Sequence, residues 1–141
     1  MKPFFIAIGA VVILVLAGAF VLPQPGGTGR TDPDVIADAG MHWHPMLEMY
    51  VKGEKIEIPQ NIGIGAVHQP MHTHDDLPII HLEFPGMVRT QDILLGRFFD
   101  IWGKDMGSFG TNMMMTVNGK ENTEYGNYMM RDGDKIALRY E

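Results

Sequence analysis

The residues of this sequence best suited to binding or reaction chemistry are its six histidines, which all lie between positions 42 and 81. Two pairs have the spacing His-x-His, at His42 and His44 and at His72 and His74, and His81 follows the second pair closely. There is no cysteine, so a metal ion bound here would have imidazole nitrogen rather than thiolate sulfur as its donor. Imidazole binds zinc, copper, iron and nickel. We therefore expect a metal site formed by these five side chains.

The local pattern gives these histidines a common orientation. Alternate residues of a strand point to opposite faces, so an extended chain at His42 and His44 turns Trp43 toward the core. A later apolar segment alternates in the same way, which puts His81 and Glu83 together on its polar face. We therefore expect ligands on a pocket wall, held in place by buried neighbours.

Carboxylates near the second histidine pair extend the ligand set. Asp75 and Asp76 directly follow His74, and Asp75 is expected to orient an imidazole by accepting its second N–H, or to bind the metal directly. With Glu83 they also offer a zinc site, since zinc sites without cysteine combine histidine with carboxylate. His68 is expected to be a bystander.

The methionines favour copper over zinc. The chain has twelve of them, and Met41, Met46 and Met71 flank the histidines as candidate thioether ligands. Thioether sulfur selects Cu(I), whereas imidazole accepts both oxidation states of copper. A blue-copper centre is disfavoured because it requires a cysteine thiolate. We therefore expect copper, with zinc as the alternative.

Other functional classes find little support. The net charge is −6 and there is no run of Lys and Arg, so nucleic acid is not an expected partner. The nucleophile, Walker and dinucleotide motifs are missing. Cupin oxygenases place a glutamate after an HxH pair, but Glu83 lies further from His74 than that spacing allows. Metal binding is therefore favoured over catalysis, and a small mononuclear metalloenzyme is the alternative.

The N-terminal residues predict a membrane anchor. The run from Phe4 to Leu22 carries no charge and is long enough to cross a bilayer as a helix. Lys2 precedes it, which predicts a cytoplasmic N-terminus and an extracytoplasmic remainder. A cleavable signal with the small residues 17–19 as its cleavage site is the alternative, although the apolar run exceeds the usual length. Residues 1–22 are therefore expected to hold the protein in the plasma membrane by a single pass.

Composition divides the rest of the chain in two. Residues 23–40 are rich in Pro, Gly, Asp and Thr, which predicts a flexible linker. Residues 41–141 contain the apolar periodicities of a folded domain with one modest core. We expect this extracytoplasmic domain to carry the metal.

Periodicity within the domain predicts several strands and one main helix. Alternating hydrophobicity marks the strands, and the first two are expected to form a hairpin. The expected strands cover residues 46–52, 55–58, 78–84, 112–117 and 135–140. Spacing of i, i+4 and i+7 predicts a helix over 90–102 that ends at Gly103.

This order of elements is typical of an α+β domain, in which a helix packs on one face of a small mixed sheet. The run from Tyr128 through an Asp-Gly-Asp turn to Leu138 resembles the ending of β-grasp, ubiquitin-like domains. That resemblance implies that the final strand is central in the sheet. A small β-sandwich of cupredoxin type is the alternative.

The motifs HWHP, HTHD and IHLE, with the run from Phe98 to Gly103, resemble an uncharacterised group of membrane-anchored prokaryotic proteins. The resemblance covers the stretch from His42 to Trp102 and implies no particular activity. In ligand type, though not in motif spacing, the chain is similar to periplasmic His/Met copper chaperones.

These features predict a membrane-anchored, extracytoplasmic copper-binding protein. Its role would be metal capture, delivery or support of a membrane oxidase or monooxygenase, with the lipid bilayer as its first partner. A structural accessory subunit of a membrane complex is a further alternative. The histidines exceed what one tetrahedral centre needs, so a dinuclear site, or a site bridging the copies of a homo-oligomer, stays open.

Overall fold

The computed structural model describes residues 32–141 and places three β-sheets and one α-helix in them. The strands are β1 (Val35–Ala37), β2 (Met41–Trp43), β3 (Met46–Val51), β4 (Glu54–Ile56), β5 (Met71–His72), β6 (His81–Phe84), β7 (Val88–Arg89), β8 (Met114–Val117), β9 (Lys120–Asn122) and β10 (Lys135–Tyr140). The helices are the α-helix α2 (Leu95–Trp102) and the short 3-10 helices η1 (Thr90–Ile93), η2 (Met106–Phe109) and η3 (Tyr125–Asn127).

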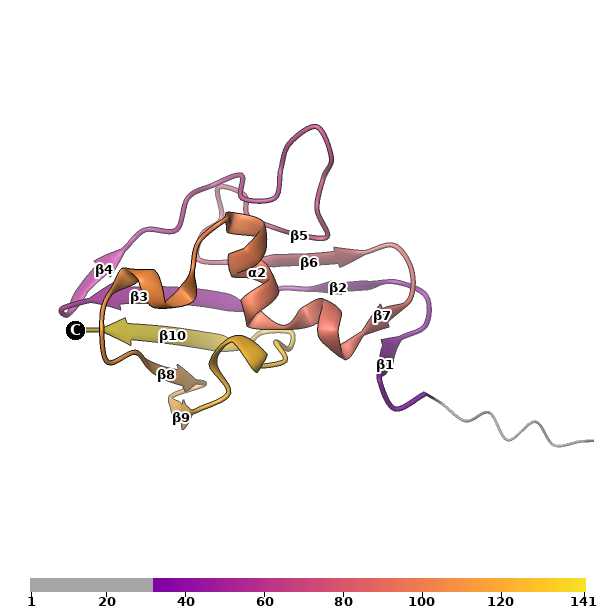
Figure 1. The fold of residues 1–141 in the computed structure, drawn as a ribbon. Helices are drawn as coiled ribbons and strands as arrows, with labels where there is room; N and C mark the ends of the chain where they lie inside the picture. Colours follow the sequence, from indigo (N-terminus) through magenta and orange to yellow (C-terminus); the bar gives the residue numbers. More distant parts are fainter. Residues whose placement is uncertain (1–31) are drawn as a thin grey trace, which may run out of the picture. The chain divides into compact units, whose positions relative to one another are not determined.

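The largest sheet has the strand order β4-β3-β10-β8-β9, in which β3 and β10 are parallel and the other neighbours are antiparallel (Figure 1). Alternation fixes its inner face, because Ile136, Leu138 and Tyr140 of β10 are all buried. The turn at Asn118-Gly119 has positive φ at both residues, as this hairpin-forming pair favours. The prediction of a small mixed-sheet α+β domain with one main helix is confirmed.

A second sheet carries the histidines and has the strand order β2-β6-β5. Strand β2 runs on into β3 after a short break (Figure 1). Met46 at the start of β3 pairs with Ile79 just before β6. Pro45 lies in that break, is buried, and accepts the Ile80 N–H on its carbonyl at 2.8 Å. One stretch of chain therefore serves both sheets and ties the histidine-bearing strands to the larger one.

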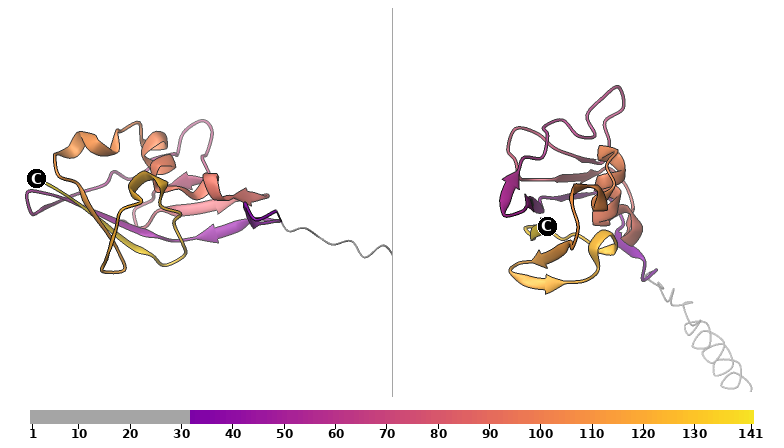
Figure 2. Two further views of the ribbon diagram at one scale, coloured as in Figure 1. Left: turned by 60° about the horizontal axis from the view of Figure 1, so that its bottom comes forward. Right: turned by 60° about the vertical axis from the view of Figure 1, so that its left-hand side comes forward.

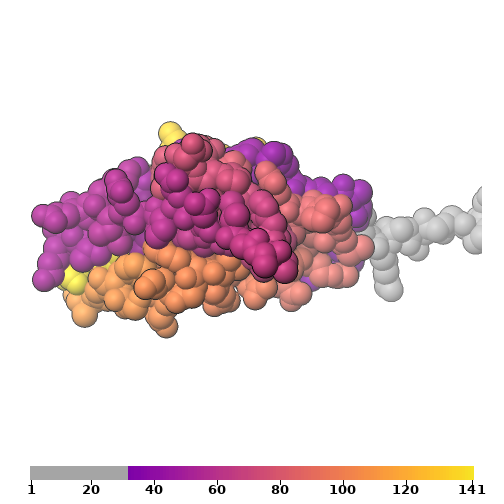
Figure 3. Space-filling view, turned by 90° about the horizontal axis from the view of Figure 1, so that it is seen from above, coloured from indigo at the N-terminus to yellow at the C-terminus, as the bar shows by residue number. Residues whose placement is uncertain are grey.

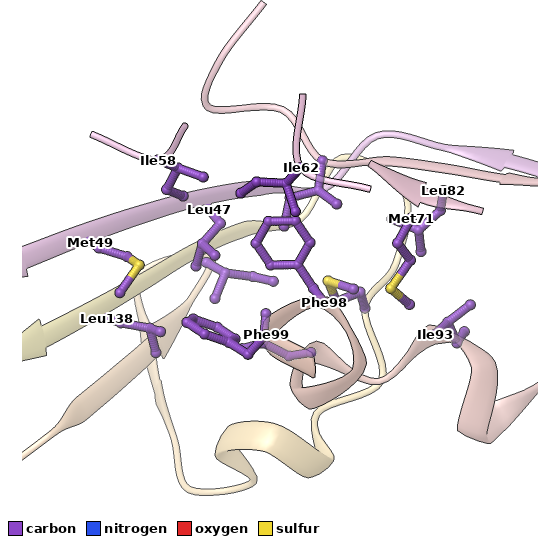
Figure 4. Close-up of a cluster of buried hydrophobic side chains, with 14 of the residues drawn as sticks. Leu47, Met49, Ile58, Ile62, Met71, Leu82, Ile93, Phe98, Phe99 and Leu138 are labelled. Carbon is purple, nitrogen blue, oxygen red and sulfur yellow. The ribbon is translucent and has the colours of Figure 1, made fainter. Parts of the chain in front are cut away.

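The helix α2 packs on one side of the strands (Figure 2) and buries an apolar face. Phe98 and Phe99 project from it into the space that Leu47 and Leu138 line from the larger sheet (Figure 4). Gly103 ends the helix in the left-handed conformation, as the sequence predicted. This apolar layer is the core that supports both sheets.

An extended residue divides the predicted helix 90–102. Its first turn is η1, and Leu94 then has β-type dihedral angles before α2 begins. The cause is backbone pairing, because Leu94 bridges Met129 and the Leu95 N–H donates to the Tyr128 carbonyl at 2.9 Å. Pairing with a distant segment thus overrides local helix propensity, which the spacing of apolar residues does not reveal.

The folded unit begins before the predicted boundary at Met41. Strand β1 pairs with β7, and Arg89 Nη1 lies 2.9 Å from Asp32 Oδ2. Residues 32–40 are therefore part of the domain and not of a flexible linker, because they supply β1 to a two-stranded sheet with β7. The predicted anchor, and the part of the predicted linker before Asp32, lie outside the described residues. Within residues 32–141, no helix is long and apolar enough to cross a membrane.

Thr73 anchors the long segment between β4 and β5. Its side chain is fully buried, and its hydroxyl donates to the Pro59 carbonyl at 2.8 Å and accepts the Ile62 N–H at 3.1 Å. In the space-filling view, this magenta segment lies across the middle of one face (Figure 3). Because Thr73 is the middle residue of the second His-x-His pair, its inward anchoring also fixes the positions of His72 and His74.

The buried phenol of Tyr140 makes stability sensitive to alkaline pH. It donates to the Met106 carbonyl at 2.7 Å, and burial raises its pKa to about 12. Between pH 10, the pKa of the unfolded phenol, and about pH 12, the folded state keeps the phenol proton that the unfolded state loses. The free energy of unfolding should therefore fall as pH rises through this range, by up to about 1.4 kcal/mol per pH unit. Urea unfolding from pH 8 to 11 should therefore show a shallower decline in Tyr140→Phe than in the parent. Parallel declines would contradict this role of Tyr140.

Candidate metal centre

The three-stranded sheet places histidines and a glutamate on one face. Its register sets His42 of β2 opposite Glu83 of β6, and His72 of β5 opposite His81 of β6. Residues directly opposite each other in antiparallel strands share a face, and alternation puts His81 and Glu83 on that same face. The sheet therefore gathers side chains that are far apart in the sequence.

The other face of these strands is apolar. Leu82 lies between His81 and Glu83, is fully buried, and opposes Trp43 on one side and Met71 on the other. Trp43 packs against the core as predicted. The ligand face is therefore backed by a layer of packed side chains.

His72 is the most unusual of these residues. Its side chain is 1% exposed, and its Nδ1 lies 3.1 Å from the Gln69 carbonyl oxygen. A carbonyl only accepts, so Nδ1 carries the proton and Nε2 keeps its lone pair. Among the described residues, His72 Nε2 is the one buried side-chain polar atom without a hydrogen-bond partner. Burial also lowers the pKa of His72, which favours the neutral form that binds metals.

His81 is held by Asp76, where the sequence had favoured Asp75. Its Nε2 lies 3.0 Å from both carboxylate oxygens of Asp76. This hydrogen bond is the largest cause of the lowered pKa of Asp76. With Nε2 donating to Asp76, the lone pair of His81 is on Nδ1, and the carboxylate orients the ring as in many metal sites. The turn before β6 brings the carboxylate of Asp76 to the His81 ring, so Asp76 rather than Asp75 takes this role.

Glu83 lies between the histidines. Its Oε1 is 3.0 Å from His42 Nε2 and 3.9 Å from His81 Nδ1, while its Oε2 is 3.9 Å from His72 Nε2. The side chain is 45% exposed, so it meets solvent on one side and the buried imidazole on the other. A carboxylate at this point adds an oxygen donor and a negative charge to the cluster.

His44 is positioned by a residue that the sequence did not reveal. Its backbone N–H donates to Asp132 Oδ1 at 2.8 Å, and its Nδ1 lies 4.0 Å from the same oxygen. Asp132 belongs to the Asp-Gly turn before β10 and was assigned only a turn role. No spacing rule connects residues this far apart, so only the fold could show the contact.

The imidazole rings form one continuous array. His44 lies 5.0 Å from His81 between ring centroids, and His81 lies 4.9 Å from His74 and 5.4 Å from His72. His68 joins this array at 4.3 Å from His72. The loop 61–70 folds back over β5 and so brings His68 beside His72, but His68 belongs to neither of the donor sets close enough to hold an ion. That His68 is a bystander to the ligands stays a prediction.

Two sets of donors are close enough to hold one ion each. The first is His42, His44 and His81, and the second is His72, His81 and Glu83; within each set the ligand atoms lie within 4.8 Å of one another. His74 belongs to neither set, although its ring lies 4.8 Å from that of His72. The five predicted histidines thus lie in one cluster, and His81 is common to both sets.

The methionines contribute less than the sequence suggested. Met71 is buried in the core, and Met41 packs against that core, because both lie on the apolar face of their strands. Met46 alternates with the buried Leu47 and lines a surface depression with Pro78. Of the three candidate thioether ligands, only Met46 faces away from the core.

Comparison of the sequence with protein-family models finds no match, and comparisons with curated proteins and with solved structures find no significant similarity. The geometry of the histidine cluster is therefore the basis for inferring function.

Proposed function

We propose that this chain is a membrane-anchored, extracytoplasmic copper-binding protein that captures and delivers the metal or supports a membrane oxidase or monooxygenase. The observation that carries the proposal is His72 Nε2, which is buried and lacks a hydrogen-bond partner within the described chain. Buried polar atoms in folded proteins are nearly always paired, and a bound metal ion would supply the partner here. His81 and Glu83 offer the further donors.

Copper is supported by the donor set. Sites with nitrogen and oxygen ligands bind divalent copper more tightly than zinc in the Irving–Williams order. Because Met41 and Met71 face the core, the ligands favour Cu(II) over a thioether-bound Cu(I). Zinc is the alternative, since two histidines and one glutamate also form a zinc site.

The proposed location depends on the sequence of the N-terminal residues. The run from Phe4 to Leu22 supports a single-pass anchor in the plasma membrane, and Lys2 before it supports an extracytoplasmic domain. A domain held at that surface would keep its metal close to a membrane oxidase or monooxygenase.

We also propose that the larger sheet is a β-grasp. The support is its order, in which the final strand β10 lies parallel to β3 at the centre, between the hairpin β3-β4 and the pair β8-β9. On this assignment, the histidine-bearing sheet is an addition to the β-grasp, formed by the extension of β3 back into β2 and by the segment before α2.

A small mononuclear metalloenzyme is the second candidate. His72, His81 and Glu83 form a set of two histidines and one carboxylate, as in catalytic zinc sites and in non-haem iron oxygenases. A surface depression lined by His42, Glu83 and Phe84 adjoins this set and would admit a small substrate.

Metal analysis of the full chain in detergent tests the proposal. We expect Cu(II) to bind and to outcompete zinc, with an electron paramagnetic resonance spectrum showing hyperfine splitting from imidazole nitrogen. Preferential binding of zinc or iron with an exchangeable water ligand would favour the enzyme instead. The absence of any metal above background after loading would reject both functions.

A further inference from the structure

We infer that a single metal ion is loaded through two neighbouring positions that share His81. The outer position, for capture, consists of His42, His44 and His81, and the inner position, for retention, consists of His72, His81 and Glu83. The inference rests on the proposed metal-binding function and adds the route by which the ion reaches and leaves its site.

The shared ligand makes the two positions alternatives. Asp76 occupies His81 Nε2 through contacts of 3.0 Å to both of its oxygens, which leaves Nδ1 as the one nitrogen able to bind a metal. One imidazole lone pair binds one ion. An ion in the inner position therefore takes from the outer position its best-buried ligand, and full occupancy is one ion per chain.

Among the histidines, exposure decreases from the outer position to the inner one, whereas Glu83 of the inner position is 45% exposed and reaches solvent. The side chains of His42 and His44 are 61% and 40% exposed, whereas those of His81 and His72 are 12% and 1% exposed. An arriving hydrated ion meets the exposed imidazoles first. The buried His72 cannot bind until the ion has lost water, so it is suited to the last step of uptake and the first step of release.

Glu83 connects the two positions. One of its oxygens lies 3.0 Å from His42 Nε2 and the other lies 3.9 Å from His72 Nε2. His81 Nδ1 is 3.9 Å from the first oxygen. An ion passing from His42 to His72 therefore stays next to this carboxylate and to His81 throughout, so it exchanges histidine ligands without first becoming free.

Rapid-mixing kinetics with Cu(II) alone test the inference on the full chain in detergent. Binding is followed by tryptophan fluorescence, since Trp43 lies between His42 and His44. In the double variant His42→Ala and His44→Ala, we expect association to slow by about tenfold or more while one ion still binds at saturation. In His72→Ala, we expect association to stay fast and dissociation to accelerate by about 100-fold.

The exposed His68 supplies the matched control. It lies beside His72 but belongs to neither ligand set, so His68→Ala should leave the association rate within about twofold of the parent. Two ions per chain at saturation, or unchanged association in the double variant, would overturn the inference while leaving a metal-binding function intact. A parent chain that binds no Cu(II) would instead reject the proposed function and this inference with it.

Discussion

Replacement of His72 by alanine should lower the Cu(II) affinity of the full chain by at least about 100-fold, because replacing mere supporting partners of metal ligands already costs 10–100-fold. Among the proposed ligands, His72 is the one whose burial and hydrogen bonding best suit metal binding. The Gln69 carbonyl fixes its tautomer, burial lowers its pKa and so favours the neutral form, and its Nε2 is left unpaired. Competition against a chelator of known affinity measures the loss.

The same substitution also affects folding, because it removes a buried ring and the Nδ1 hydrogen bond to the Gln69 carbonyl. It costs the metal-free protein no hydrogen bond at Nε2, which is unpaired there. His68→Ala, beside it in the array, should change affinity by less than about tenfold, well short of the loss of a ligand. An equal loss in the two variants would show that the cluster acts only as a diffuse patch of imidazoles.

Local alternation predicted the orientation of the site correctly. Trp43 and Leu82 are on the core face, while His42, His81 and Glu83 are on the other, because a strand has a period of two whatever its neighbours. The same rule holds in β10, where Ile136, Leu138 and Tyr140 are all buried. Features set by a single strand and its burial could therefore be inferred from the sequence.

Features set by contacts between distant segments could not be inferred. Asp132, far from His44 in the sequence, accepts a hydrogen bond from the His44 backbone N–H. Leu94 is extended because it pairs with Met129. Met71 looked like a ligand by its place beside His72, yet the alternation of β5 turns it into the core. The short strand β5 was missed because two residues are too few to show a period.

The packing beneath the ligands should matter as much as the ligands themselves. Leu82 is fully buried between Trp43 and Met71, directly behind His81 and Glu83. Truncation to alanine should lower the free energy of unfolding by about 2–5 kcal/mol through lost burial and a residual cavity. It should also lower Cu(II) affinity by about tenfold, because strands free to shift no longer hold the ligands in register. Urea unfolding and chelator competition measure the two effects.

Leu138 offers a matched control for this coupling. It is equally buried but lies in β10, at the centre of the other sheet. Leu138→Ala should therefore cost a similar 2–5 kcal/mol of stability, with the affinity of the folded fraction within about twofold of the parent. If both variants lost affinity equally, the ligands would depend on the stability of the whole domain. A loss confined to Leu82→Ala would instead show that the apolar face of β6 holds His81 and Glu83 in position for the metal.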